Sequence, residues 1–214
     1  MNEPVSGAPP RSTYRHGDLR RALLDAGIEL ARTGGPEAVV LREATRRAGV
    51  VPNAAYRHFA SRGDLLQAVR AHALSSLARD MEAQLAALPA KGRAGDLARA
   101  SLRAVGSGYL QFALAETGLF RTAFSGSDQV EGDADPAKAG ASGLNPFELL
   151  GAALDRMVQA KVVPAARRPG AEYLAWSAVH GMALLLIDGP LRGLPPEQVQ
   201  ALGQRLLVMV EKGL

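Results

Sequence analysis

Residues 41–66 of this chain, LREATRRAGVVPNAAYRHFASRGDLL, decide its fold. The first part, residues 41–48, has a helical pattern, and it is followed by Gly49, a residue type that adopts positive φ without steric cost. Pro52 suits the first turn of a new helix, because its missing N–H would have no helical partner there. This order predicts a helix, a glycine turn and a second helix of about two turns over residues 53–58.

A third helix is predicted directly after this pair. Ser61 and Asp64 have the three-residue spacing that is typical of a capped helix N-terminus. Apolar residues then recur at spacings of three and four through Met81, which predicts a long helix that ends near Pro89. A helix, a glycine turn and a short second helix form the helix-turn-helix motif, in which the second helix enters the major groove of DNA.

The stretch also resembles the DNA-binding signature of the TetR (tetracycline-repressor-type) family of bacterial regulators. Tyr56, His58 and Phe59 match the Tyr-x-His-Phe pattern of the family, and Ser61-Arg62 stands where the family usually has Ser-Lys. The resemblance implies an all-α protein, in which a three-helix helix-turn-helix head is followed by a helical ligand-binding and dimerisation domain.

The similarity extends in both directions along the chain. Upstream it includes residues 14–20 and 42–43, and downstream Trp176 and His180-Gly181 resemble a Trp…His-Gly element in the C-terminal domain of one subgroup. We expect three parts: a disordered arm over residues 1–14, a DNA-binding domain over residues 15–62, and an effector-binding and dimerisation domain over residues 63–214. The arm is either a solvated tail or a basic segment that touches DNA.

The positive charge of the chain is concentrated in its first third. Residues 1–72 contain 11 arginines and 7 acidic residues, a net charge of +4, whereas residues 73–214 contain 14 basic and 14 acidic residues. A basic module joined to a neutral body is what phosphate binding requires, although a net charge of this size is also ordinary for a protein domain.

Several function classes have no support in the sequence. The N-terminus has no apolar signal region, and the longest apolar run, residues 182–187, is too short to span a bilayer. The chain has no cysteine and 4 histidines without metal-ligand spacing, and it contains no nucleotide-binding glycine motif. We therefore expect a cytoplasmic protein that is not an enzyme, with no cofactor, no metal and no membrane partner.

Hydrophobic periodicity predicts the helices of the body. We expect helices over residues 62–88, 96–116, 118–124, 146–163 and 171–187, and a last helix that begins at Pro195-Pro196. Upstream, a first helix over residues 18–32 should end at Gly34-Gly35-Pro36. Residues 125–143 are polar and rich in glycine and lack a hydrophobic period, so we expect a mobile loop there.

The candidate DNA contacts lie on the two short helices and at the start of the long one. Asn53 can pair with adenine through its amide, or it can cap the helix instead. By the family resemblance, the aromatic and basic residues contact bases or phosphates, and the alternative is a solvated surface. The predicted set is Arg42, Val51, Pro52, Asn53, Ala55, Tyr56, His58 and Arg62.

Bulky side chains on the inward faces of the body helices predict an effector pocket, because such sites are apolar cavities with a few polar groups. The alternative is a filled core. His180 is the nearest approach to a catalytic residue, but a histidine on an apolar helix face is usually a hydrogen-bonded core residue. The predicted lining is Tyr109, Phe112, Phe120, Phe124, Leu150, Trp176 and His180.

The last two helices are candidates for a dimer interface. Two amphipathic helices can pair with their copies in a four-helix bundle, or they can close the core of the monomer; the family resemblance favours the dimer. The predicted interface residues are Ala175, Ala178, Met182, Val199, Leu202, Leu206 and Val210.

These features together indicate a transcriptional regulator. The resemblance implies a repressor that binds a palindromic double-stranded DNA operator as a homodimer and is released by a small-molecule effector. One alternative is a constitutive DNA-binding protein whose body binds no effector. A helical enzyme is a further alternative, which the lack of a nucleophile–base pair disfavours.

Overall fold

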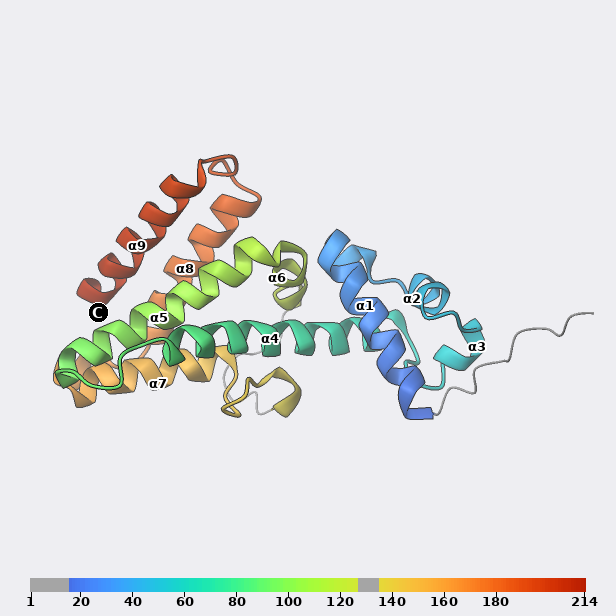
Figure 1. The fold of residues 1–214 in the computed structure, drawn as a ribbon, viewed down its shortest axis with the longest axis horizontal. Helices are drawn as coiled ribbons and strands as arrows, with labels where there is room; N and C mark the ends of the chain where they lie inside the picture. Colours follow the sequence, from blue (N-terminus) through green and yellow to red (C-terminus); the bar gives the residue numbers. More distant parts are fainter. Residues whose placement is uncertain (1–15, 127–134) are drawn as a thin grey trace, which may run out of the picture.

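The computed structural model describes residues 16–126 and 135–214, and every regular element within these ranges is a helix (Figure 1). The all-α fold class is confirmed. The expected arm, residues 1–14, lies outside the described residues, as do residues 127–134 of the expected loop. A small N-terminal head and a larger helical body lie at opposite ends of an elongated molecule (Figure 1).

Three helices form the head: α1 (His16–Ala38), α2 (Leu41–Arg47) and α3 (Pro52–Ala55). The helical path of α1 breaks at Gly35, which has φ 68° and ψ −164°. The predicted stop at residues 34–36 is thus a kink, after which one further turn leads to α2. Leu23, Val39 and Phe59 pack between the three helices as the core of the head.

The turn after α2 has the predicted conformation. Gly49 adopts φ 68°, and its N–H donates to the carbonyl of Arg46 at 3.3 Å, while Val50 N donates to Thr45 O at 3.1 Å. These two bonds form a Schellman motif, which satisfies the carbonyls at the end of a helix. Because this motif requires a left-handed residue, the position favours glycine.

The prediction of a two-turn second helix over residues 53–58 was wrong. Helix α3 has 4 residues, and residues 56–58 form a hydrogen-bonded turn in which His58 N and Phe59 N both donate to Ala55 O. The helix ends early because Phe59 turns into the core of the head, where it is 2% exposed.

Helix α4 (Arg62–Ala86) joins the head to the body. Its 25 residues correspond to about 37 Å of continuous helix. Ser61 caps it by accepting a hydrogen bond from Asp64 N at 3.1 Å, as the sequence predicts. In Figure 1, α4 runs from α1 in the head to α7 in the body without a break.

The body is built around α5, which packs against α4, α6, α7, α8 and α9. Asn145 and Glu148 form a capping box at the start of α7, which explains the sharp start of this helix at Pro146. The body elements are α5 (Ala94–Ala115), α6 (Thr117–Ala123), η1 (Pro136–Lys138), α7 (Pro146–Gln159), η2 (Ala165–Arg167), α8 (Ala171–Ile187) and α9 (Pro196–Gly213).

The part of the expected loop that the structure describes is packed on α4, which contradicts the prediction for residues 135–143. Ser75 Oγ donates to Ala139 O at 2.6 Å. The carboxylate of Glu82 accepts the N–H groups of Ala141 and Ser142, each at 2.8 Å. These bonds come from side chains on α4, so local periodicity gives no signal for them.

The Glu82 contacts predict a measurable effect on stability. Glu82→Ala removes the acceptor for two backbone N–H groups and should lower the free energy of unfolding by about 1–3 kcal/mol. Glu82→Gln retains one carbonyl oxygen and should cost less. Denaturant unfolding of both variants tests this, and a Glu82→Ala variant as stable as the native chain would show that the segment does not depend on α4.

Candidate DNA interface and internal cavity

The outer end of the head exposes part of the predicted DNA-binding set. Arg42, on α2, and Asn53, on α3, are exposed, and the exposed fractions of Val51 and Tyr56 are 69% and 57%. An exposed valine and tyrosine beside an amide and a guanidinium form a surface that can meet bases and phosphates. Pro52 is the first residue of α3.

The other three residues of that set differ in how far they are available to DNA. Ala55 is 0% exposed and packs in the core of the head, so it cannot reach DNA. His58 is only half-buried. Arg62 donates to Val39 O at 2.9 Å and to Pro36 O at 2.8 Å, and it pairs with Glu37 at 3.3 Å. The guanidinium of Arg62 therefore ties the end of α1 to the start of α4. Its side chain is 43% exposed, so the predicted phosphate contact stays a prediction.

A charge cluster covers the exposed side of α2. Glu43 accepts two hydrogen bonds from Arg46, at 2.7 and 2.9 Å, and one from Arg47 at 3.2 Å. The hydrogen bonds from Arg46 and then Arg47 lower the pKa of Glu43 to about 2. Glu43 is thus ionised at neutral pH and competes with any phosphate for these two arginines.

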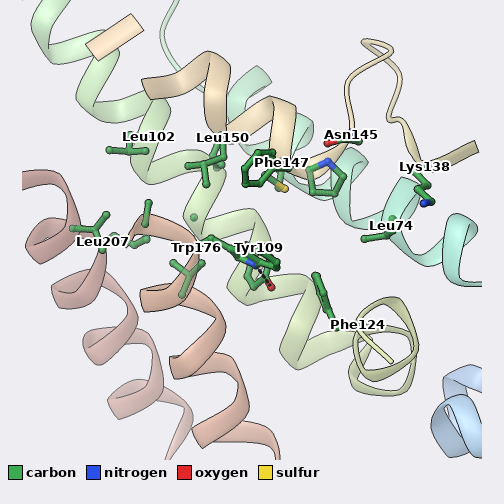
Figure 2. Close-up of a pocket in the computed structure, with 17 residues that line it drawn as sticks. Leu74, Leu102, Tyr109, Phe124, Lys138, Asn145, Phe147, Leu150, Trp176 and Leu207 are labelled. Atoms are coloured by element: carbon green, nitrogen blue, oxygen red, sulfur yellow. Dashed lines mark hydrogen bonds between the residues drawn. The ribbon is translucent and has the colours of Figure 1, made fainter. Parts of the chain in front are cut away.

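The body encloses a cavity of about 80 Å³ between α4, α5, α7 and α8 (Figure 2). Most of its wall is apolar, and Trp176, the single tryptophan of the chain, forms part of it. Its lining consists of Leu74, Met81, Leu102, Val105, Gly106, Tyr109, Phe124, Lys138, Asn145, Pro146, Phe147, Leu150, Ala175, Trp176, Val179, Leu207 and Val210.

The cavity contains four of the seven predicted lining residues: Tyr109, Phe124, Leu150 and Trp176. Phe112 and Phe120 are each 1% exposed and belong to the packed core, not to the cavity wall. His180 lies behind the wall, in contact with Tyr109. Helical periodicity shows which side chains point inward, but it does not show which of them leave a gap between them.

Sequence reasoning missed Lys138 and Phe147 on the wall. Lys138 lies in the segment that was expected to be a mobile loop, and a charged residue there gives no signal of burial. Phe147 directly follows Pro146, the first residue of α7.

One hydrogen-bonded network joins the cavity wall to α8. Trp176 Nε1 donates to the hydroxyl of Tyr109 at 3.1 Å, and that hydroxyl lies 2.7 Å from His180 Nδ1. The hydroxyl has one donor and two acceptor positions, so it can accept from Trp176 and either donate to Nδ1 or accept from it, depending on the tautomer of His180. Burial lowers the pKa of His180 and raises that of Tyr109, which favours the neutral form of both. Trp176 and His180 lie one helical turn apart, and so both reach Tyr109.

Helix α6 contacts both the cavity and the head. Phe124, directly after α6, lines the cavity. At the start of α6, a Cβ added to Gly118 would collide with the carbonyl oxygens of Ala31 and Arg32 in α1, so the two helices touch through their backbones. Beside this contact, Arg32 Nε pairs with Glu116 at 2.8 Å.

The outer surface of α8 is largely apolar. α8 contains one charged residue, Glu172, and its outward side chains include Leu174, 67% exposed, and Leu185, 43% exposed. Met209 of α9 is also exposed. A helix face without charges that is open to water is a candidate interface.

The structure places the predicted interface residues in three different surroundings. Ala175 and Val210 line the cavity and lie inside the monomer, and Val199 borders a groove between α5 and α9. Ala178, Met182, Leu202 and Leu206 are half-buried beside the exposed face. The prediction omitted Leu174, Leu185 and Met209, because α8 is apolar on all sides and periodicity does not distinguish its outer face.

A helix-turn-helix head joined to a helical body is the architecture of a DNA-binding protein. The chain matches the family model "Bacterial regulatory proteins, tetR family" over residues 23–69 and the model "Tetracyclin repressor-like, C-terminal domain" over residues 102–210. It belongs to the TetR family and is a DNA-binding transcriptional regulator. The family consists of regulators and not of enzymes.

Solved structures share this fold along almost the whole chain. A protein of unknown function from Rhodococcus sp. RHA1 is 24% identical with a TM-score of 0.74, over 95% of this chain and 99% of that one. The TetR family regulator PfmR from Thermus thermophilus is 21% identical with a TM-score of 0.55, over 87% and 97%. Comparison with curated proteins yields no match. Among the described residues, no helix is both long and apolar enough to cross a membrane.

The Glu43 cluster predicts an increase in DNA affinity on mutation. Glu43→Gln removes the carboxylate that holds Arg46 and Arg47, so both guanidinium groups become available to phosphates. Nonspecific binding should tighten, and the slope of log affinity against log salt should steepen by about one to two units. Asp64→Asn, which removes the same charge from an exposed residue in the first turn of α4, is the matched control. An equal change in both variants would mean that only net charge matters.

Burial of His180 predicts an acid-sensitive body. Because the folded pKa of His180 is lowered, the unfolded chain binds more protons below about pH 6.5, and stability should fall as the pH decreases through that value. His72, whose pKa is lowered by burial and by Arg79 and Arg32, contributes with the same sign. In His180→Gln, the free energy of unfolding should fall less between about pH 7 and pH 5.5 than it does in the native protein. Denaturant unfolding across this range measures it, and an unchanged slope in the variant would contradict the assignment.

Proposed function

We propose that this regulator is a repressor that binds a palindromic operator as a homodimer and leaves it when a small molecule occupies the cavity. The observation that carries the proposal is the position of α6. This helix borders the cavity through Phe124 and the DNA-binding head through Gly118. A change in cavity shape therefore has a direct route of packed atoms to the head.

The head supplies the DNA contacts of the proposed complex. Asn53 and Tyr56 are the candidates for base and backbone contacts on α3 and its following turn, and Arg42 is the candidate for a phosphate contact from α2. A helix of 4 residues presents few groups to the bases. One head can discriminate only a few base pairs, at about 1–3 kcal/mol for each good bidentate contact.

A dimer would double the number of base contacts, because it carries two recognition helices. A genome offers about 10⁶ or more competing sites, which a single short recognition helix cannot exclude. The uncharged outer face of α8, together with Met209 of α9, supports a two-fold interface, because a symmetric dimer would cover the exposed Leu174 and Leu185. Two-fold symmetry requires an inverted-repeat operator with half-sites about 34–36 Å apart, or a multiple of that distance.

Release from DNA requires a difference in affinity between two states. An effector shifts the equilibrium only by the ratio of its affinities for the two conformations, and a shift from about 1:99 to 99:1 needs a ratio of about 10⁴. The cavity of about 80 Å³ is smaller than the roughly 300–1,000 Å³ of most ligand sites, so an effector of that size must widen it. Widening displaces Phe124 and α6, and with them α1 and α4.

The small cavity also favours a second candidate, a constitutive DNA-binding protein whose body stays closed. A thermal-shift screen separates the two functions, since a ligand that binds only the folded protein raises the melting temperature as its concentration exceeds Kd. The proposed repressor requires that such a ligand also lowers operator affinity. A compound that stabilises the protein and leaves operator affinity unchanged would favour the constitutive function.

The dimer predicts the effect of a charge on the outer face of α8. Leu185→Glu places a carboxylate at an exposed position, so the monomer should fold normally while the dimer loses its interface. Sedimentation should show monomers, and operator affinity should fall by about 10² or more. Ala83→Glu, at an exposed position on α4, is the control and should remain dimeric. Tight operator binding by a monomeric native chain would contradict the proposal.

A further inference from the structure

Aromatic side chains are concentrated on the cavity wall. Aromatic residues make up 5% of the chain, yet they account for four of the 17 residues that line the cavity. The four come from α5, from the residue after α6, from α7 and from α8, so elements far apart in the sequence bring the rings together. These wall residues are Tyr109, Phe124, Phe147 and Trp176 (Figure 2).

The rings on the wall are tilted relative to one another. The ring centroids of Phe124 and Trp176 are 6.1 Å apart with an interplanar angle of 44°, and those of Phe147 and Trp176 are 6.2 Å apart at 74°. Tyr109 and Phe124 are 6.0 Å apart at 43°. Because no parallel partner covers a ring face within these three pairs, a further ring that enters the cavity can contact both faces and edges, which are the arrangements that aromatic pairs prefer.

The polar groups on the wall already have partners within the protein. Trp176 Nε1 donates to the Tyr109 hydroxyl, which is also hydrogen-bonded to His180 Nδ1. The side chain of Asn145 caps the start of α7, and Lys138 also has an interaction within the protein. A charged ligand group would give up its hydration and compete for groups that are already engaged, which is unfavourable in an apolar cavity. The wall therefore favours an uncharged ligand.

We propose that the effector is an uncharged molecule with an aromatic ring, and that this ring binds among Phe124, Phe147 and Trp176. The inference rests on the proposed effector function and names the chemical class of the ligand. Phe124 directly follows α6, the helix that touches α1 of the head through Gly118. A ligand ring that displaces Phe124 thus acts on the element that lies between the cavity and the head.

The experiment compares uncharged aromatic compounds with aliphatic and charged compounds of similar size. Single-ring probes are chosen because they require the least widening of a cavity of about 80 Å³. Toluene and methylcyclohexane are titrated into the native protein, with each Kd expressed as a fraction of the aqueous solubility of the compound, so that their different hydrophobicities cancel. Benzyl alcohol, benzoate and benzylamine are titrated in the same way. The melting temperature and the fluorescence of Trp176, the single tryptophan, report binding.

The two comparisons test the two parts of the ligand class. Toluene should bind about two- to tenfold more tightly than methylcyclohexane on this scale, because ring–ring contacts add to the burial of apolar area. Benzoate and benzylamine should each bind about tenfold or more weakly than benzyl alcohol, because each would bury a charge.

Variants of single rings assign the preference to the wall. Phe147→Leu removes one ring from the lining and keeps an apolar side chain, so it should reduce the preference for toluene over methylcyclohexane. Phe112→Leu is the matched control, because Phe112 is a buried ring outside the lining, and it should keep the native preference. Each variant is compared with its own melting temperature without ligand. If Phe147→Leu does not fold, Phe124→Leu takes its place.

The outcomes separate the ligand class from the effector function. A preference for toluene that decreases in Phe147→Leu and not in Phe112→Leu supports the inference. Methylcyclohexane that binds as tightly as toluene, or a charged compound that binds as tightly as benzyl alcohol, overturns the ligand class and leaves the cavity as an effector site. An equal preference in both variants also overturns it. If none of the compounds binds, the ligand class is wrong and a constitutive regulator is favoured. A bound aromatic compound that leaves operator affinity unchanged counts against the repressor function and not against the ligand class.

Discussion

The structure depends on one continuous helix, α4, which is packed at both ends. Near its start, Leu65 and Val69 are fully buried against α1, so close to Gly27 that an added Cβ would lie 2.9 Å from a Val69 methyl group. Further along, Leu74 and Met81 line the cavity. A close-packed helix transmits displacement because its ends cannot shift independently. The orientation of the head is therefore fixed by the same helix that forms the wall of the cavity.

Much of the head could be predicted from sequence because its signals are local. Gly49 has to adopt a left-handed conformation, and Ser61 has to cap the next helix, and both requirements are visible as residue types at fixed spacing. The errors arose where tertiary packing overrides local preference. Phe59 ends α3 after one turn because it fills the core, and Ala55, one of the predicted DNA contacts, is fully buried in the same core.

The cavity was less predictable, for a physical reason. Periodicity identified Tyr109, Phe112 and Phe120 as inward-facing, and all three are buried, but whether neighbouring rings close a gap depends on distances that no local pattern contains. Lys138 was missed because its burial depends on η1 packing against α4. The Trp176–Tyr109–His180 network gives the Trp…His-Gly resemblance a physical basis for its first two residues, since each bonds the same hydroxyl.

The uncharged outer face of α8 has a consequence for the choice of partner. Helices usually reject wrong partners by placing like charges opposite one another, and Leu174, Gly181 and Leu185 carry no such groups. In the proposed dimer, self-recognition rests on shape alone, with Gly181 open to close approach by another helix. Related regulators in the same cell whose α8 has an outer face of similar shape could then exchange subunits with this one. A mixed dimer would recognise an operator with two unlike halves, so the DNA sites available would exceed those of either parent.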